Sequence, residues 1–139
     1  MTNSIQLPHP YPVSYQRGSR RAEGSSCSIC PANWHLPNSG GSNDEAGSFY
    51  NLLSKYSLTS SPTSGNNNIA TSPLYFVRSG YVYPDASYLG SAGYSGRYWS
   101  GRADSSSYAY YLYFYSSSVS PSISYNRYNG YSVRCVAAR

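Results

Sequence analysis

The strongest hydrophobic alternation in the chain runs through residues 108–115. Leu112 and Phe114 fall on one face of this segment if it is extended, because successive side chains of a strand point to opposite faces. The other face would carry three tyrosines: Tyr111, Tyr113 and Tyr115. The pattern therefore predicts a strand that packs one face against a core and displays the other.

Further apolar runs predict shorter strands around this one. The runs 74–77 and 81–83 flank a Ser-Gly pair and predict a hairpin. Residues 119–122 are expected to follow a serine turn, and residues 131–136 to form a closing strand.

A single helix is predicted before these strands, between a cap at Ser42 or Asn43 and an end before Ser57. Acidic residues occupy its first turn, and four large side chains recur at helical spacing: Phe49, Leu52, Leu53 and Tyr56. One early helix followed by many short strands predicts an α+β fold with a small, mostly antiparallel sheet and long loops.

The composition fits one folded domain preceded by an extended segment. Residues 1–26 contain three prolines and an Arg/Gly/Ser stretch, which predict an N-terminal arm or linker. The domain itself is expected to cover residues 27–139. Charged residues make up only 11% of the chain and aromatic residues 17%, the opposite of the composition of a disordered chain.

The net charge is +5, and the positive charge is scattered along the chain except for Arg17, Arg20 and Arg21 near the N-terminus; Lys55 is the single lysine. Scattered charge indicates a role in solubility and not a positively charged surface that binds nucleic acid, so no nucleic-acid substrate is expected. No apolar run approaches the length of a membrane span. Residues 1–15 lack the regions of a signal peptide, which leaves the export route open, with a cell-surface or extracellular location favoured.

Three cysteines leave more than one pairing open. Cys27 and Cys30 form a C-x-x-C motif, but His9 and His35 have no zinc-ligand spacing to it, so no metal site and no cofactor are expected. The favoured arrangement is a disulfide between Cys30 and Cys135, which leaves Cys27 over. In a reducing compartment both would instead be buried thiols.

The last third of the chain is crowded with tyrosine and serine. Ten tyrosines lie between Tyr94 and Tyr131, among serine runs at 105–107 and 116–118. Tyrosine gives broad, rigid contact area at low entropic cost, and small polar residues give adaptable hydrogen bonds. This composition favours ligand binding. The sequence has no G-x-S-x-G elbow and its carboxylates are dispersed, so no catalytic residues and no enzymatic activity are expected.

Three ordered blocks carry a family resemblance: CPANWHLP at residues 30–37, YWS at 98–100 and GYSVRCV at 130–136. They resemble the Fibrobacter-type major paralogous domains, which belong to the C-type lectin-like group together with formylglycine-generating-enzyme-like proteins. The resemblance covers about residues 27–139 and implies a C-type lectin-like fold with a small twisted sheet. Gly101-Arg102 departs from the small hydroxyl residues usual in the family. We expect Trp34 and Trp99 to be core anchors.

Within this group the chain most closely resembles the variable proteins of diversity-generating retroelements. There a C-terminal segment is diversified at the gene level by a reverse transcriptase, through changes at adenines copied from a template. The mutable codons are typically AAC or AAT, which reach Tyr, Ser, Asp, Ile, His and Thr but not Lys, Glu, Gln or Met. None of the latter four residue types occurs after Lys55, and the variable region is expected at about residues 94–130.

The framework of this region is expected to include Leu112, Phe114, Val119, Pro121 and Arg127. The candidate ligand-facing positions are Ser107, Tyr108, Tyr111, Tyr113, Tyr115, Ser118, Ser120, Ile123, Ser124, Tyr125, Asn126, Tyr128 and Asn129. Tyr94, Ser95 and Arg97 extend this set toward the N-terminus.

The resemblance implies a receptor-like protein that binds an unknown protein or glycan. Two alternatives remain open at this point. One is a fixed surface adhesion domain of the major paralogous type, and the other is a carbohydrate-binding domain that stacks sugars on tyrosine. The tripeptides of calcium-dependent lectins are absent from the sequence.

Overall fold

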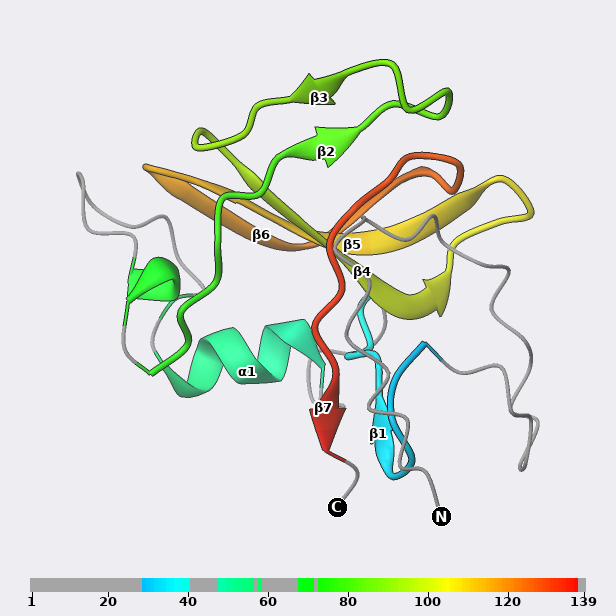
Figure 1. The fold of residues 1–139 in the computed structure, drawn as a ribbon. Helices are drawn as coiled ribbons and strands as arrows, with labels where there is room; N and C mark the ends of the chain where they lie inside the picture. The colour runs from blue at the N-terminus through cyan, green and yellow to red at the C-terminus, as the bar shows by residue number, and fades with distance from the viewer. Residues whose placement is uncertain (1–28, 41–47, 57, 59–67, 72, 138–139) are drawn as a thin grey trace, which may run out of the picture.

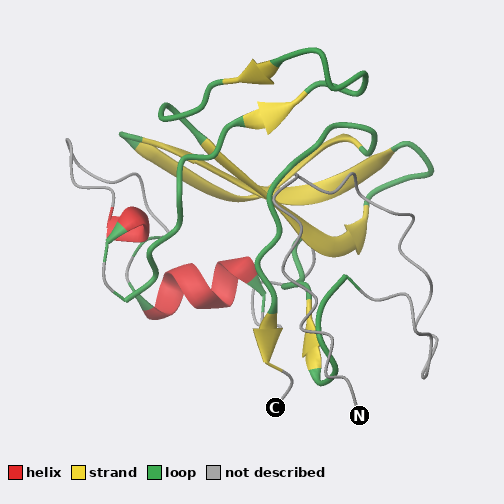
Figure 2. Cartoon of the chain, in the orientation of Figure 1, coloured by secondary structure: helices red, strands yellow, loops and turns green. Residues whose placement is uncertain are grey.

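In a computed structural model, the described residues are 29–40, 48–56, 58, 68–71 and 73–137. The arm predicted for residues 1–26 lies outside them. The described elements, in chain order, are β1 (Trp34–His35), α1 (Phe49–Lys55), the 3-10 helix η1 (Asn68–Ala70), β2 (Tyr81–Val82), β3 (Leu89–Gly90), β4 (Gly96–Ala103), β5 (Tyr108–Tyr115), β6 (Ser118–Asn126) and β7 (Val136–Ala137). A short α-helix combined with antiparallel strands gives an α+β fold (Figure 2).

The largest sheet is antiparallel, with β5 between β4 and β6. The strand predicted over residues 108–115 is confirmed. The strand expected around residues 119–122 is part of β6 and follows the turn at 116–117. The register shifts once between β4 and β5 and once between β5 and β6, and such irregularities bend and twist a sheet.

The helix is shorter than expected. Its N-cap is Ser48, whose backbone is extended (φ −74°, ψ 155°) and whose Oγ accepts a hydrogen bond of 3.0 Å from the Asn51 N–H. An extended cap residue cannot lie inside a helix, so the predicted start at Ser42 or Asn43, which lie outside the described residues, is wrong. The acidic pair at 44–45 therefore precedes the helix instead of occupying its first turn.

One face of the three-stranded sheet packs against α1 and forms the main core (Figure 1). Leu112 and Phe114 of β5 are fully buried there with Phe49 and Leu53 of the helix. Phe76 contacts Phe114 and Phe49 edge-on, with ring centroids 6.2 and 6.4 Å apart. The packed face predicted from the alternation of β5 is therefore the core face.

The predicted hairpin between residues 74–77 and 81–83 is wrong. Tyr75 has a φ of +47°, which a strand cannot contain, while the flanking Leu74 and Phe76 are buried in the core. β2 pairs instead with β3, its partner later in the chain, through a turn in which the Ser87 N–H donates to the Asp85 carboxylate at 3.0 Å. Figure 1 shows this β2–β3 hairpin on the side of the sheet away from α1.

The closing strand is also shorter than predicted. Only Val136–Ala137 is a strand, and it pairs with β1. Ser132 instead bridges to Tyr98 of β4, where the Trp99 N–H donates to the Ser132 carbonyl at 3.0 Å. Trp99 is 1% exposed, as a core anchor should be, whereas Trp34 is 48% exposed and the expectation that it anchors the core is wrong.

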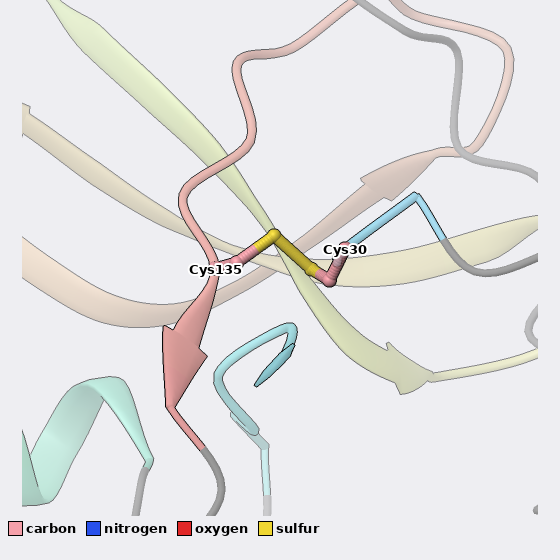
Figure 3. The surroundings of a disulfide bond; sticks show 2 residues. All are labelled: Cys30 and Cys135. Atoms are coloured by element: carbon pink, nitrogen blue, oxygen red, sulfur yellow. A yellow bond between two sulfur atoms is a disulfide. The ribbon is translucent and has the colours of Figure 1, made fainter. Parts of the chain in front are cut away.

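A disulfide joins Cys30 to Cys135, the pairing favoured from the sequence (Figure 3). The two cysteines are 105 residues apart, and their bond lies next to the β1–β7 pair. It ties the beginning of the described chain to its end.

We expect replacement of Cys30 and Cys135 by serine to lower the free energy of unfolding by about 2–5 kcal/mol, because a crosslink of such separation restricts the unfolded chain strongly. Urea unfolding with and without reductant measures this. Reductant should destabilise the natural chain and leave the double variant unchanged. A non-reduced peptide map that links Cys27 to Cys135 would contradict the assignment.

Candidate ligand-binding surface

The second face of the sheet carries most of the predicted ligand-facing residues of β5 and β6. The antiparallel register pairs Tyr113 with Arg97, Tyr111 with Trp99 and Tyr115 with Ser118. Cross-strand partners lie on one face, so the tyrosines of β5 share this face with Arg97. Ser120 and Ile123 of β6 join it opposite Tyr113 and Tyr111.

The middle of this face is a second core. Trp99 stacks on Tyr131 with ring centroids 4.3 Å apart, and Tyr111 lies 4.8 Å from Tyr131. Tyr81 of β2 covers the cluster, and Ile123 packs at its edge. Tyr111 is only 6% exposed, so the prediction that it is displayed is wrong: it faces away from Leu112, but into a second layer of aromatic packing.

Two other candidates are buried as well. Ser95 is 1% exposed in the turn before β4, and Asn129 is 5% exposed, with its side chain donating to the Asn126 carbonyl at 3.1 Å. Both residues lie in turns. Short polar residues are common in turns as well as at ligand-contacting positions, so the sequence alone could not tell these two roles apart.

Around the buried cluster runs a continuous row of exposed and half-exposed tyrosines. At one end Tyr94 stacks on Tyr115 with ring planes 9° apart, and Tyr115 lies 5.7 Å from Tyr113. At the other end Tyr83 lies 5.4 Å from Tyr81 and 5.6 Å from Tyr88. We call this row, with the residue at its centre, the tyrosine surface: Tyr81, Tyr83, Tyr88, Tyr94, Arg97, Tyr113 and Tyr115.

Arg97 lies at the centre of the row and joins its two halves. Its guanidinium lies 4.0 Å from the centre of the Tyr81 ring and 5.4 Å from that of Tyr113. Three of the tyrosines in the row, those of the β2–β3 hairpin, were missed in the sequence because they precede the tyrosine-rich last third. The spacing of Tyr81, Tyr83 and Tyr88 around a Pro-Asp turn was the available signal.

The remaining candidates lie at the other end of the sheet. Tyr108 and Tyr125 contact each other edge-on at 6.5 Å, and Tyr128 is 58% exposed nearby in the chain. The eight residues of β5 separate this group from Tyr115 by about 25 Å. Tyr108 and Tyr110 lie in register with Asn126 and Ser124, on the face of β5 that holds Leu112, so these positions do not extend the tyrosine surface. Ser107 is exposed in the loop before β5.

The titration of the buried tyrosines follows their surroundings. Burial raises the pKa of Tyr131 strongly and raises the pKa of Tyr111, while the nearby Arg97 lowers both by a smaller amount. Burial also raises the pKa of Tyr98 in the main core. Ionised phenolate is therefore unfavourable in either core.

Within the described ranges, no group of three or more His, Cys, Asp or Glu side chains is placed to hold a metal ion. The two described aspartates have local partners: Asp85 accepts from Ser87, and Asp104 accepts from the Tyr110 hydroxyl at 2.7 Å. No helix in the described part of the chain is long and apolar enough to cross a membrane.

Comparisons of the chain with known proteins found no matching family model, no matching curated protein and no matching solved structure.

We expect Tyr111→Ser to lower the free energy of unfolding by about 3 kcal/mol, because it opens a cavity in the aromatic core. Tyr113→Ser removes the same ring from the neighbouring, half-exposed position on the same face and should cost only about 1 kcal/mol. Urea unfolding of the two variants provides the comparison. Equal losses would show that the face is not divided into a buried and an accessible part.

Alkaline pH should destabilise the fold. The pKa values of Tyr98, Tyr111 and Tyr131 are raised in the folded state, so the unfolded chain loses protons first as the pH rises past about 10. The stability that these groups contribute is complete below that pH and falls above it. Urea unfolding at about pH 9 and about pH 11 measures the loss. Tyr131→Phe, which cannot ionise, should show a smaller fall, and an equal fall would contradict the assignment.

Proposed function

We propose that this chain is a ligand-binding, receptor-like protein without enzymatic activity, in which the tyrosine surface contacts the ligand. The observation that carries the proposal is the division of the second sheet face. Trp99, Tyr111 and Tyr131 fix the fold, and the surrounding tyrosine rings are open to a partner. Exposed Tyr94, Tyr83 and Tyr88 have no role in either core cluster.

We further propose that the fold is C-type lectin-like and that the surface is diversified by a reverse transcriptase acting on a template copy of the gene. The three sequence blocks at residues 30–37, 98–100 and 130–136 support this, and the α+β architecture is compatible with it. The disulfide between the ends of the described chain supports a cell-surface or extracellular location, since such bonds persist in oxidising compartments.

Diversification has to spare the two cores, because most large losses of stability come from core substitutions. Tyr113, Tyr115, Ser118, Ser120 and Tyr125 are accessible and satisfy this requirement. The buried Ser95, Tyr111 and Asn129 do not, and we remove them from the proposed variable set.

Sequencing the gene and its flanks tests the proposal. We expect a nearby reverse transcriptase gene and a near-identical repeat that differs from this gene at adenines. The differences should fall under accessible codons such as those of Tyr113 and Tyr115, and not under Leu112, Phe114 or Tyr111. A region without such a repeat would overturn the diversification and leave a fixed adhesion or glycan-binding surface.

A further inference from the structure

Arg97 is the only cation in the tyrosine surface, and it is held by rings rather than by carboxylates. It lies on β4, half-buried, between Tyr81 and Tyr113. Its Nη1 donates a hydrogen bond of 3.3 Å to the Tyr131 hydroxyl, and its Nε is buried and donates to no group among the described residues.

The charge of Arg97 is therefore not neutralised by the described part of the chain. The rings of Tyr81, Tyr113 and Tyr131 offer their electron-rich faces, which attract the guanidinium but carry no net charge. Asp85 and Asp104 are engaged with Ser87 and Tyr110, and within the described residues no ion pair reaches Arg97. A partly desolvated cation of this kind attracts an anion more strongly than an arginine in open water does.

We propose that Arg97 is the anchor for a carboxylate of an acidic protein ligand. A guanidinium matches a carboxylate because its planar fork can donate two parallel hydrogen bonds. Tyr81 and Tyr113 hold the fork in place, so a ligand carboxylate meets a preorganised partner and little side-chain entropy is lost. The inference rests on the proposed function, since it names the chemistry that the tyrosine surface selects.

The extent of the surface favours a protein over a sugar. From Tyr94 to Tyr88 the row comprises six consecutive contacts of 4.0 to 6.1 Å, contributed by the β2–β3 hairpin, the turn before β4 and the sheet. This exceeds the reach of one sugar ring, and tyrosines around a central arginine are the residue types that dominate binding energy at protein interfaces. The net charge of +5 adds long-range attraction for an acidic partner.

The test is selection of a random peptide library, displayed on phage, against the full chain. Enriched peptides should contain Asp or Glu, and titration calorimetry should show that Arg97→Gln weakens a selected peptide about thirtyfold or more. Arg102→Gln removes the same charge from an exposed position of the same strand and should change affinity less than about threefold. Replacement of the acidic peptide residue by its amide should have little further effect on the Arg97→Gln variant.

The amide peptide is also titrated against the natural chain, where it should lose affinity as much as the acidic peptide loses on Arg97→Gln. That measurement changes only the peptide, so it does not depend on the stability of a protein variant. Peptides that bind without an acidic residue, yet lose affinity on Tyr94→Ala or Tyr113→Ala, would overturn the carboxylate anchor and leave the proposed function standing. Peptides insensitive to both tyrosine changes would overturn the proposed function itself. If glucuronate, and not N-acetylglutamate, shifts the NMR signal of the Arg97 Nε–H, the ligand is an acidic glycan and the protein assignment is wrong.

Discussion

The structure depends on the requirement that β5, the central strand of a three-stranded sheet, be covered on both faces. Leu112 and Phe114 meet α1 and Phe76 on one side, while Tyr111 meets Trp99 and Tyr131 on the other. The elements that pack on the two faces are small: a helix of seven residues on one and a hairpin with two-residue strands on the other. Neither would be stable alone. Each becomes stable only by packing on the sheet. The Cys30–Cys135 disulfide adds to this by limiting the unfolded chain.

Tyrosine suits the aromatic layer on the second face of the sheet, because its ring is apolar and its hydroxyl is polar. The Trp99–Tyr131 stack excludes water from the sheet, and the Tyr131 hydroxyl still finds a donor in Arg97. Leucine in place of Tyr131 would leave the guanidinium of Arg97 without one of its ring faces and without its hydroxyl acceptor. The second core and the tyrosine surface are therefore one physical unit: the same hydroxyls and rings that fill the interior also position the central cation.

Part of the architecture was accessible from sequence periodicity. The alternation across β5 predicted the strand and its core face, because period-two patterning needs only local information. The same alternation predicted that Tyr111 is displayed, and it failed because periodicity assigns a face but cannot show what covers that face. The β2–β3 hairpin that covers it begins thirty residues before Tyr111 in the chain. The segment 74–77 failed for a different reason: its buried side chains, Leu74 and Phe76, flank a residue with positive φ, a backbone state that an apolar run does not reveal.

The same reasoning explains why the tyrosine surface was predicted only in part. Tyrosine enrichment marked the last third of the chain, but it could not distinguish the three positions that are buried from those that are open. Nor could it add Tyr81, Tyr83 and Tyr88, which reach the surface through the pairing of β2 with β3 and through Arg97. Arg97 itself was included only at the margin of the set. Its importance comes from two contacts: the cross-strand register places it opposite Tyr113, and its guanidinium lies 4.0 Å from the centre of the Tyr81 ring. A single charge does not stand out in a sequence; enclosed by neutral rings, it is the basis of the preference for acidic ligands that we propose.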